Sequence, residues 1–156
     1  MKRMPAMTRA EKNRHGEEFR LLCREKHLPF TKQRRAVLQA VLDLGSHPTA
    51  EDVVASAPVR KAGVSRATVY RTLEHMASMG VVHRVDHRGS AIRYDGRTVL
   101  HHHFICTRCN RVTDIASATL DAIPIPPAGN FGFLVKDHRV QLSGLCRHCF
   151  NNTTET

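Results

Sequence analysis

Hydrophobic residues in the first half of the chain recur three and four positions apart, which is the spacing of one helix face. The pattern predicts helices over residues 17–27, 31–45, 49–57 and 65–80. Thr31, Thr49 and Ser65 stand where a side-chain oxygen can cap the first turn. Gly45 and Gly80 stand where two of these helices should end. The first half of the chain is therefore expected to be largely helical.

From residue 81 the apolar positions alternate, as they do in β-strands. Two alternating runs meet at Arg88-Gly89-Ser90 and predict a β-hairpin. Further strands are expected over residues 102–106, 111–116 and 132–142, with a short helix over 118–123 and a rigid loop at 124–130. Helices followed by a basic hairpin are the order of a winged helix.

The predicted fold class is therefore α+β, with two domains. An N-terminal winged-helix DNA-binding domain is expected over residues 1–96, of which residues 1–15 would form a basic flexible arm. A small α/β domain is expected over residues 97–156. Because so small a domain buries little apolar surface by itself, it should depend on dimerisation and on a bound zinc ion.

The formal net charge is +10, and the excess lies before residue 98, where 19 Lys and Arg face 10 Asp and Glu. A basic surface alone is most often simply solvated. Combined with the winged-helix pattern, it indicates a protein that binds the phosphate backbone of double-stranded DNA.

The helix predicted over residues 65–80 carries near its start the side chains that a recognition helix needs. Small and aromatic residues can contact thymine methyl groups, and arginine can reach phosphates or base edges. The candidate DNA-binding residues on this helix are Arg66, Ala67, Thr68, Tyr70 and Arg71. On the hairpin, Arg84, Arg88 and Arg93 are placed to contact phosphates. The alternative is an ordinary amphipathic helix with a mixed polar face.

Four of the five cysteines form two Cys-x-x-Cys pairs, Cys106 with Cys109 and Cys146 with Cys149. Four thiolates at this spacing are typical of a structural zinc site with no open coordination position. A redox dithiol, the competing interpretation, normally needs only one pair. The fifth cysteine, Cys23, lies on the apolar face of a predicted helix and is expected to be a buried core thiol.

The chain has neither the apolar core of a signal peptide at its start nor an apolar run long enough for a membrane span. We therefore expect a cytoplasmic protein that does not associate with membranes. Thiols stay reduced in that compartment, which favours zinc over disulfides.

The strand predicted at 102–106 also carries histidines. Because side chains alternate along a strand, His101 and His103 should share one face while His102 points to the other. Asp114 is on the adjoining strand and Asp95 ends the hairpin. Imidazoles and carboxylates without sulfur suit iron(II) or manganese(II). This spacing alone is only moderately specific for a metal site.

Six segments together resemble one known family, the ferric uptake regulators. They are TKQRRAVL, HPTAEDV, SRATVYRTLEHM, RYD, HHHFICTRC and GLCRHC, and the resemblance runs from about Phe19 to Phe150. Members are homodimeric bacterial repressors with a winged helix and a C-terminal dimerisation domain. They bind AT-rich palindromic operators when loaded with metal. The resemblance implies the same fold, DNA partner and homodimer here.

Carried across by motif, the family's regulatory metal site falls on His47, Asp95, His101, His103 and Asp114. The resemblance implies that one iron(II) or manganese(II) ion joins them and fixes the angle between the two domains. Both recognition helices of the dimer would then match successive major grooves.

Within the family, the aspartates at positions 95 and 114 and the segment GFLVKDHRVQLSG resemble the peroxide-responsive repressors. Iron-sensing members tend to carry glutamates at the two positions. In the peroxide-responsive subgroup, bound iron(II) reacts with peroxide, and a ligating histidine is oxidised. That histidine would be His47 or His101, and its oxidation would release first the metal and then the DNA.

Two features depart from the family pattern. Pro29 stands where members usually carry a lysine or arginine for the minor groove, and Lys32 is placed to substitute for it. A further family metal site would use positions that are Leu100, His102, Asp121 and His138 here, so one ligand is missing.

Two other functions compete with a peroxide-responsive repressor. One is a repressor of the same fold that senses the supply of iron, manganese, zinc or nickel without histidine oxidation. The other is a metallohydrolase, which would need an open coordination position and a general base. Five protein ligands leave little room for either, so we expect no enzyme activity.

Overall fold

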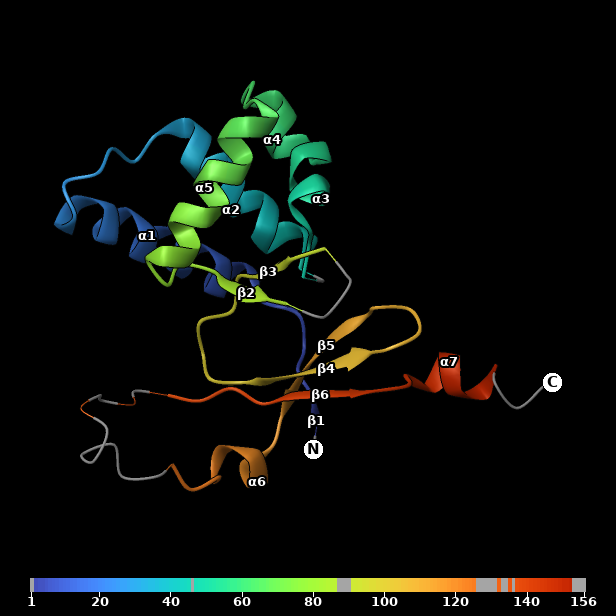
Figure 1. Cartoon of the computed structure of the whole chain (residues 1–156). Helices are drawn as coiled ribbons and strands as arrows, with labels where there is room; N and C mark the ends of the chain where they lie inside the picture. The colour runs from blue at the N-terminus through green and yellow to red at the C-terminus, as the bar shows by residue number, and fades with distance from the viewer. Residues whose placement is uncertain are drawn as a thin grey trace. The chain divides into compact units, whose positions relative to one another are not determined.

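The computed structural model of the chain describes residues 2–45, 47–86, 91–125, 132, 135 and 137–152. The chain divides into two units (Figure 1). We call Ala6–Thr98 the helical unit and Met1–Pro5 with Val99–Thr156 the sheet unit. The chain thus begins in the sheet unit, builds the helical unit and then returns to complete the sheet unit.

In its described residues, the helical unit has five helices followed by a hairpin. The helices are α1 (Arg9–Glu25), α2 (Lys32–Leu44), α3 (Ala50–Ala55), α4 (Ala57–Lys61) and α5 (Arg66–Ser78). In the hairpin, β2 (His83–Val85) pairs antiparallel with β3 (Arg93–Asp95). The predicted order of helices and then a hairpin is confirmed.

Side-chain caps fix where three helices begin. Thr31, Thr49 and Ser65 each accept a hydrogen bond from the backbone N–H three residues later, as predicted. Each such cap is worth about 1 kcal/mol. Gly45 and Gly80 follow α2 and α5 with φ of 66° and 71°, a conformation that glycine adopts without strain.

One apolar cluster forms the core of the helical unit. Its largest fully buried side chains include Phe19 of α1, Val41 of α2, and Leu73 and Met76 of α5. Cys23 is fully buried in the same cluster, which confirms the prediction of a core thiol.

The expectation for the start of the chain is wrong for the residues that the structure describes. Residues 1–15 were expected to form a flexible arm, but α1 begins at Arg9 with a capping box between Thr8 and Glu11. Lys2 and Arg3 form β1, which pairs with a strand of the sheet unit. The polar sequence conceals this order because an N-terminal edge strand and the first turns of a helix need few apolar residues.

The sheet unit contains a four-stranded sheet in the order β1-β5-β4-β6. Its strands after β1 (Lys2–Arg3) are β4 (His102–Cys106), β5 (Val112–Ala116) and β6 (Gln141–Gly144). Helix α6 (Ala118–Asp121) follows β5, and α7 (Arg147–Asn151) ends the described chain. β4 pairs antiparallel with β5 and parallel with β6, and Ile105 and Ile115 are buried in the sheet.

The strands expected at 102–106 and 111–116 are therefore present, to within one residue. The strand expected at 132–142 is shorter, because residues 137–140 have no regular structure and β6 begins at Gln141. The hairpin turn at 88–90 and most of the loop at 124–130 lie outside the described residues. None of the described helices has the length and apolar character needed to cross a membrane.

His15 gives the helical unit a testable pH dependence. Its Nε2 lies 2.8 Å from the Val81 carbonyl oxygen, and burial lowers the pKa of His15 below its ordinary value of 6.5. In the unfolded chain, His15 therefore binds a proton at a higher pH than in the folded chain. The contribution of neutral His15 to stability is fully present above pH 6.5 and is lost progressively as the pH falls below it. We predict that the metal-free protein melts at a lower temperature at pH of about 5 than at pH of about 7.

The variant His15→Gln can still donate a hydrogen bond to Val81 but does not titrate. Its melting temperature, followed by the helical circular-dichroism signal, should change less over this pH range than that of the wild type. Equal slopes for the two proteins would show that His15 does not carry the effect.

Candidate metal centres and DNA-reading surface

The two Cys-x-x-Cys pairs meet at one end of the sheet unit. Cys106 ends β4, and Cys146 is the N-cap of α7. One sulfur from each of the four cysteines lies within 4.8 Å of the others, and the Cys109 and Cys146 sulfurs are 3.9 Å apart. The Cys146 backbone N–H donates to Cys106 Sγ at 3.3 Å. Four converging sulfurs have the composition of a tetrahedral zinc site.

The thiols in this cluster differ in how readily they ionise. The backbone N–H of Cys146 contributes most to lowering the pKa of Cys106, to about 6. Burial and hydrogen bonds with neighbouring thiols raise the pKa of Cys149 to about 12. Four adjacent thiolates repel one another unless a cation compensates their charge, so the donor set fits a divalent metal ion.

A second donor set lies on β4 and β5, where the register puts His103 opposite Asp114. The Nε2 atoms of His101 and His103 are 3.1 Å apart. Asp114 Oδ1 lies 3.6 Å from His101 Nε2 and 3.7 Å from His103 Nε2. The structure thus brings these three predicted ligands together, with one carboxylate oxygen near two imidazole nitrogens.

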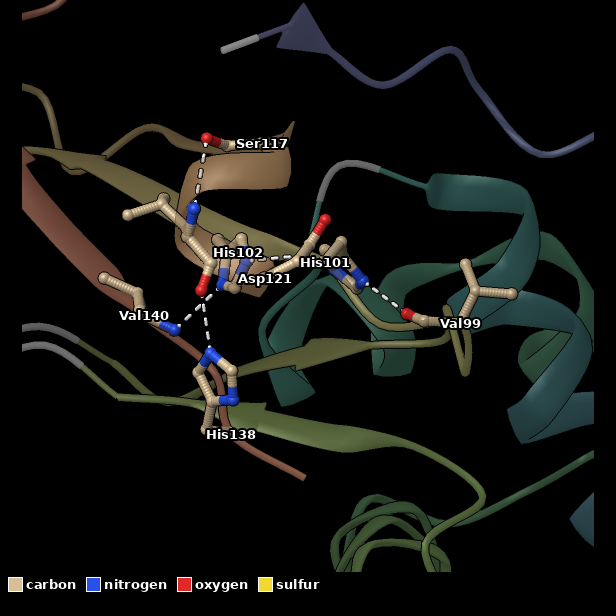
Figure 2. Close-up of polar contacts among 8 residues, drawn as sticks. Val99, His101, His102, Ser117, Asp121, His138 and Val140 are labelled. Carbon is tan, nitrogen blue, oxygen red and sulfur yellow. Dashed lines mark hydrogen bonds and ion pairs between the residues drawn. The ribbon is translucent and has the colours of Figure 1, made fainter. Parts of the chain in front are cut away.

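The backbone also orients one of these imidazoles. His101 Nδ1 lies 2.8 Å from the Val99 carbonyl oxygen, and Figure 2 shows the ring turned toward Val99. Because a carbonyl only accepts, Nδ1 must carry the proton, which leaves the Nε2 lone pair of the neutral ring directed at His103 and Asp114. A backbone carbonyl holding the distal ring N–H is a common second partner of metal-binding histidines.

The helical unit holds the other two predicted regulatory ligands, His47 and Asp95, with ligand atoms within 4.8 Å of each other. Strand β3 runs against the segment before α3, where the Tyr94 N–H donates to the Pro48 carbonyl at 2.9 Å. Arg93 Nη1 donates to the His47 carbonyl at 3.0 Å. The pairing of β3 with this segment therefore sets the imidazole beside the carboxylate.

Among the described residues, His47 is one of three besides glycine whose backbone is left-handed, with His27 and Asn110. Its φ is 53°, in the left-handed region, where a residue other than glycine costs about 1 kcal/mol. The Arg97 N–H donates to Asp95 Oδ1 at 2.8 Å and orients that carboxylate. Arg93, which is also expected to contact DNA phosphates, thus holds the backbone of the segment that carries His47.

The residues at the further family positions are arranged differently. The Val140 N–H donates to His102 Nδ1 at 3.0 Å, so this nitrogen must be unprotonated, and the other, Nε2, donates to Asp121 Oδ1 at 2.9 Å (Figure 2). His138 Nε2 lies 2.8 Å from the Leu120 carbonyl. Both nitrogens of His102 are therefore occupied within the protein. His102 points away from His101 and His103, as the alternation predicted, and ties β4 to α6 and to the segment before β6.

The predicted DNA-reading residues lie along the first turns of α5. Arg66, Ala67, Tyr70 and Arg71 are exposed and Thr68 is half-buried, while Val69 faces the core. Arg84 of β2 donates to Glu74 at 3.0 Å, and Arg88 lies outside the described residues. Sequence reasoning missed Glu51 of α3, whose carboxylate accepts hydrogen bonds from α5, because no local pattern relates positions 19 residues apart.

Comparison with known proteins decides the family. The sequence profile described as the Ferric uptake regulator family matches residues 6–143. The chain belongs to the ferric uptake regulator family. The resemblance and the α+β fold class predicted from the sequence are thereby confirmed.

Individual proteins similar to this chain include ferric uptake regulators. The peroxide operon regulator of Bacillus subtilis (strain 168) is 31% identical over 126 residues, 81% of this chain and 87% of that protein. The ferric uptake regulation protein of the same organism is 30% identical over 152 residues, 94% of this chain and 96% of that protein. The Helicobacter pylori ferric uptake regulator Fur, whose structure reveals three functional metal binding sites, has 21% identity. It shares the fold with a TM-score of 0.70, covering 96% of this chain and 97% of that one.

We predict that the four cysteine sulfurs hold one zinc ion. We also predict that the third group of residues, His102, Asp121 and His138, holds no metal ion. Cys149→Ser should lose zinc and lower the thermal stability of the sheet unit, because metal-binding energy contributes to folding. Asp121→Asn is the matched control and should keep the wild-type zinc and manganese content, measured by elemental analysis after desalting. If Asp121→Asn lost one metal ion per chain, the group of His102, Asp121 and His138 would bind metal and the prediction would be wrong.

Proposed function

We propose that this family member is a metal-dependent transcriptional repressor that binds double-stranded DNA as a homodimer. Its operator would be an AT-rich palindrome and its compartment the cytoplasm, where the four thiols remain reduced. The observation that carries the proposal is that the candidate metal ligands are distributed over both units of the chain. The helical unit holds His47 and Asp95 as well as the candidate recognition helix, and the sheet unit holds His101, His103 and Asp114.

The sheet unit would supply dimerisation and the structural zinc. The helical unit, residues 6–98, would be the DNA-binding domain, close to the boundary after residue 96 predicted from the sequence. Helix α5 would enter the major groove with Arg66, Ala67, Thr68, Tyr70 and Arg71, and Arg88 of the hairpin would contact phosphates.

The regulatory metal would couple these two units. Imidazole and carboxylate donors without sulfur fit iron(II) or manganese(II). A site that is complete only when His47 and Asp95 meet the donors of the sheet unit binds metal in one arrangement of the units. Metal binding would therefore increase the population of the arrangement that fits DNA, by an amount set by the difference in affinity.

The finer proposal is that this repressor responds to peroxide. The peroxide operon regulator and the ferric uptake regulation protein of Bacillus subtilis differ by one percentage point in identity to this chain. Overall similarity therefore does not separate the two functions, and the choice rests on Asp95 and Asp114. Iron(II) held at this site would catalyse cleavage of the peroxide O–O bond, and overall the imidazole ring would provide the two electrons that reduce the peroxide. One oxygen atom would be added to a ring carbon of His47 or His101, and the other would leave as water.

This proposal predicts which peptides gain mass. Zinc-containing protein loaded with iron(II) and treated with dilute peroxide should gain one oxygen atom on the peptide that contains His47 or His101. Its affinity for DNA should fall in parallel. Protein loaded with manganese(II) is the matched control and should gain none, because manganese(II) does not react with peroxide in this way.

Peptide mass spectrometry and fluorescence anisotropy measure the two effects. DNA binding that follows the metal concentration without any histidine oxidation would contradict peroxide sensing. It would support a sensor of metal supply with the same fold.

A further inference from the structure

A carboxylate from α3 contacts two of the candidate DNA-reading side chains of α5. Glu51 Oε1 accepts a hydrogen bond from the Tyr70 hydroxyl and lies 2.6 Å from Arg66 Nη2. The Arg66 guanidinium also lies over the Tyr70 ring, 5.8 Å from its centroid. These three residues form one cluster at the start of α5, and all of them belong to the helical unit.

The cluster lies on the surface. The side chains of Arg66 and Glu51 are 69% and 51% exposed, and Tyr70 is 39% exposed. In an exposed pair, solvent screening makes the net attraction small, so Glu51 contributes little to stability. The contact instead affects which anion these donors bind, because the Glu51 carboxylate occupies donors of Arg66 and Tyr70 that could otherwise bind another anion.

DNA phosphate is the anion that competes for these donors. Carboxylate and phosphate oxygens both accept hydrogen bonds from the arginine fork with similar geometry. Binding to DNA of arbitrary sequence depends almost wholly on such phosphate contacts. A guanidinium already held by Glu51 contributes less to that binding, whereas an oriented Tyr70 ring can still contact base edges.

We infer that Glu51 is a specificity-determining residue that acts by positioning. It holds Arg66 away from the phosphate backbone and fixes the Tyr70 hydroxyl, so that DNA of arbitrary sequence is bound less tightly relative to the operator. The inference rests on the proposed DNA-binding function and deepens it.

The test compares Glu51→Gln with the wild type, both as full chains loaded with zinc and manganese. The first probe is a random-sequence duplex, and the second is the duplex that the wild type enriches most from a random library. In Glu51→Gln, Arg66 gains a phosphate contact, so the affinity for the random duplex should rise roughly threefold at moderate salt. The slope of log affinity against log salt concentration should steepen by about 0.9. The preference for the enriched duplex over the random duplex should fall.

Two further variants separate this effect from a change in net charge. Glu17→Gln removes the same charge from α1, where Glu17 pairs with Arg20, and should leave the preference between the duplexes at the wild-type value. Arg66→Ala should abolish the effect, so Glu51→Gln combined with Arg66→Ala should bind the random duplex as Arg66→Ala does. Circular-dichroism melting confirms that each variant is folded.

An unchanged salt slope and an unchanged preference in folded Glu51→Gln would overturn the inference while leaving the proposed function intact. The same change in Glu17→Gln would also overturn it, because the effect would then be one of net charge. If the metal-loaded wild type binds neither duplex, the proposed function fails, and the inference fails with it.

Discussion

Strand β4 pairs with β5 in a register that sets His103 opposite Asp114, and the donor set of His101, His103 and Asp114 depends on that pairing. Side chains alternate along β4, so His101 and His103 converge on Asp114 while His102 turns toward Asp121. The same strand ends at Cys106, one of the four converging cysteines. A shift of one residue in the register would turn the histidine pair away from Asp114. A zinc ion that stabilises the end of β4 would therefore also help to preserve the regulatory donors.

The chain path connects the two units twice. Lys2 and Arg3 pair with β5 in the sheet unit before the chain enters the helical unit, and it returns at Val99. The Met4 N–H donates to the carbonyl of Asp114, a proposed metal ligand. The oxygen of Val99, the first residue after the return, lies beside His101 Nδ1. Both crossings of the chain therefore lie within two residues of a hydrogen bond to a candidate regulatory ligand.

Much of this arrangement follows from local sequence. The caps at Thr31, Thr49 and Ser65, the hairpin and β4 were predictable because each depends on residues close together in the chain. The four-cysteine site was predictable because each Cys-x-x-Cys pair is a local pattern. What local patterns could not provide are contacts between distant positions, namely the strand pairing of Lys2 and Arg3 and the bond from Tyr70 to Glu51. His47 is indicated as a ligand only by the family resemblance, and its left-handed backbone is visible only in the structure.

The central claim is that one regulatory ion takes donors from both units. Titrating manganese(II) into the zinc-containing protein, with free manganese followed by electron paramagnetic resonance, tests it most directly. The account predicts one manganese ion per chain. It also predicts that His47→Ala in the helical unit and His103→Ala in the sheet unit each weaken its binding by a comparable factor. If His47→Ala binds manganese as tightly as the wild type, the ion belongs to the sheet unit alone and the proposed coupling is wrong.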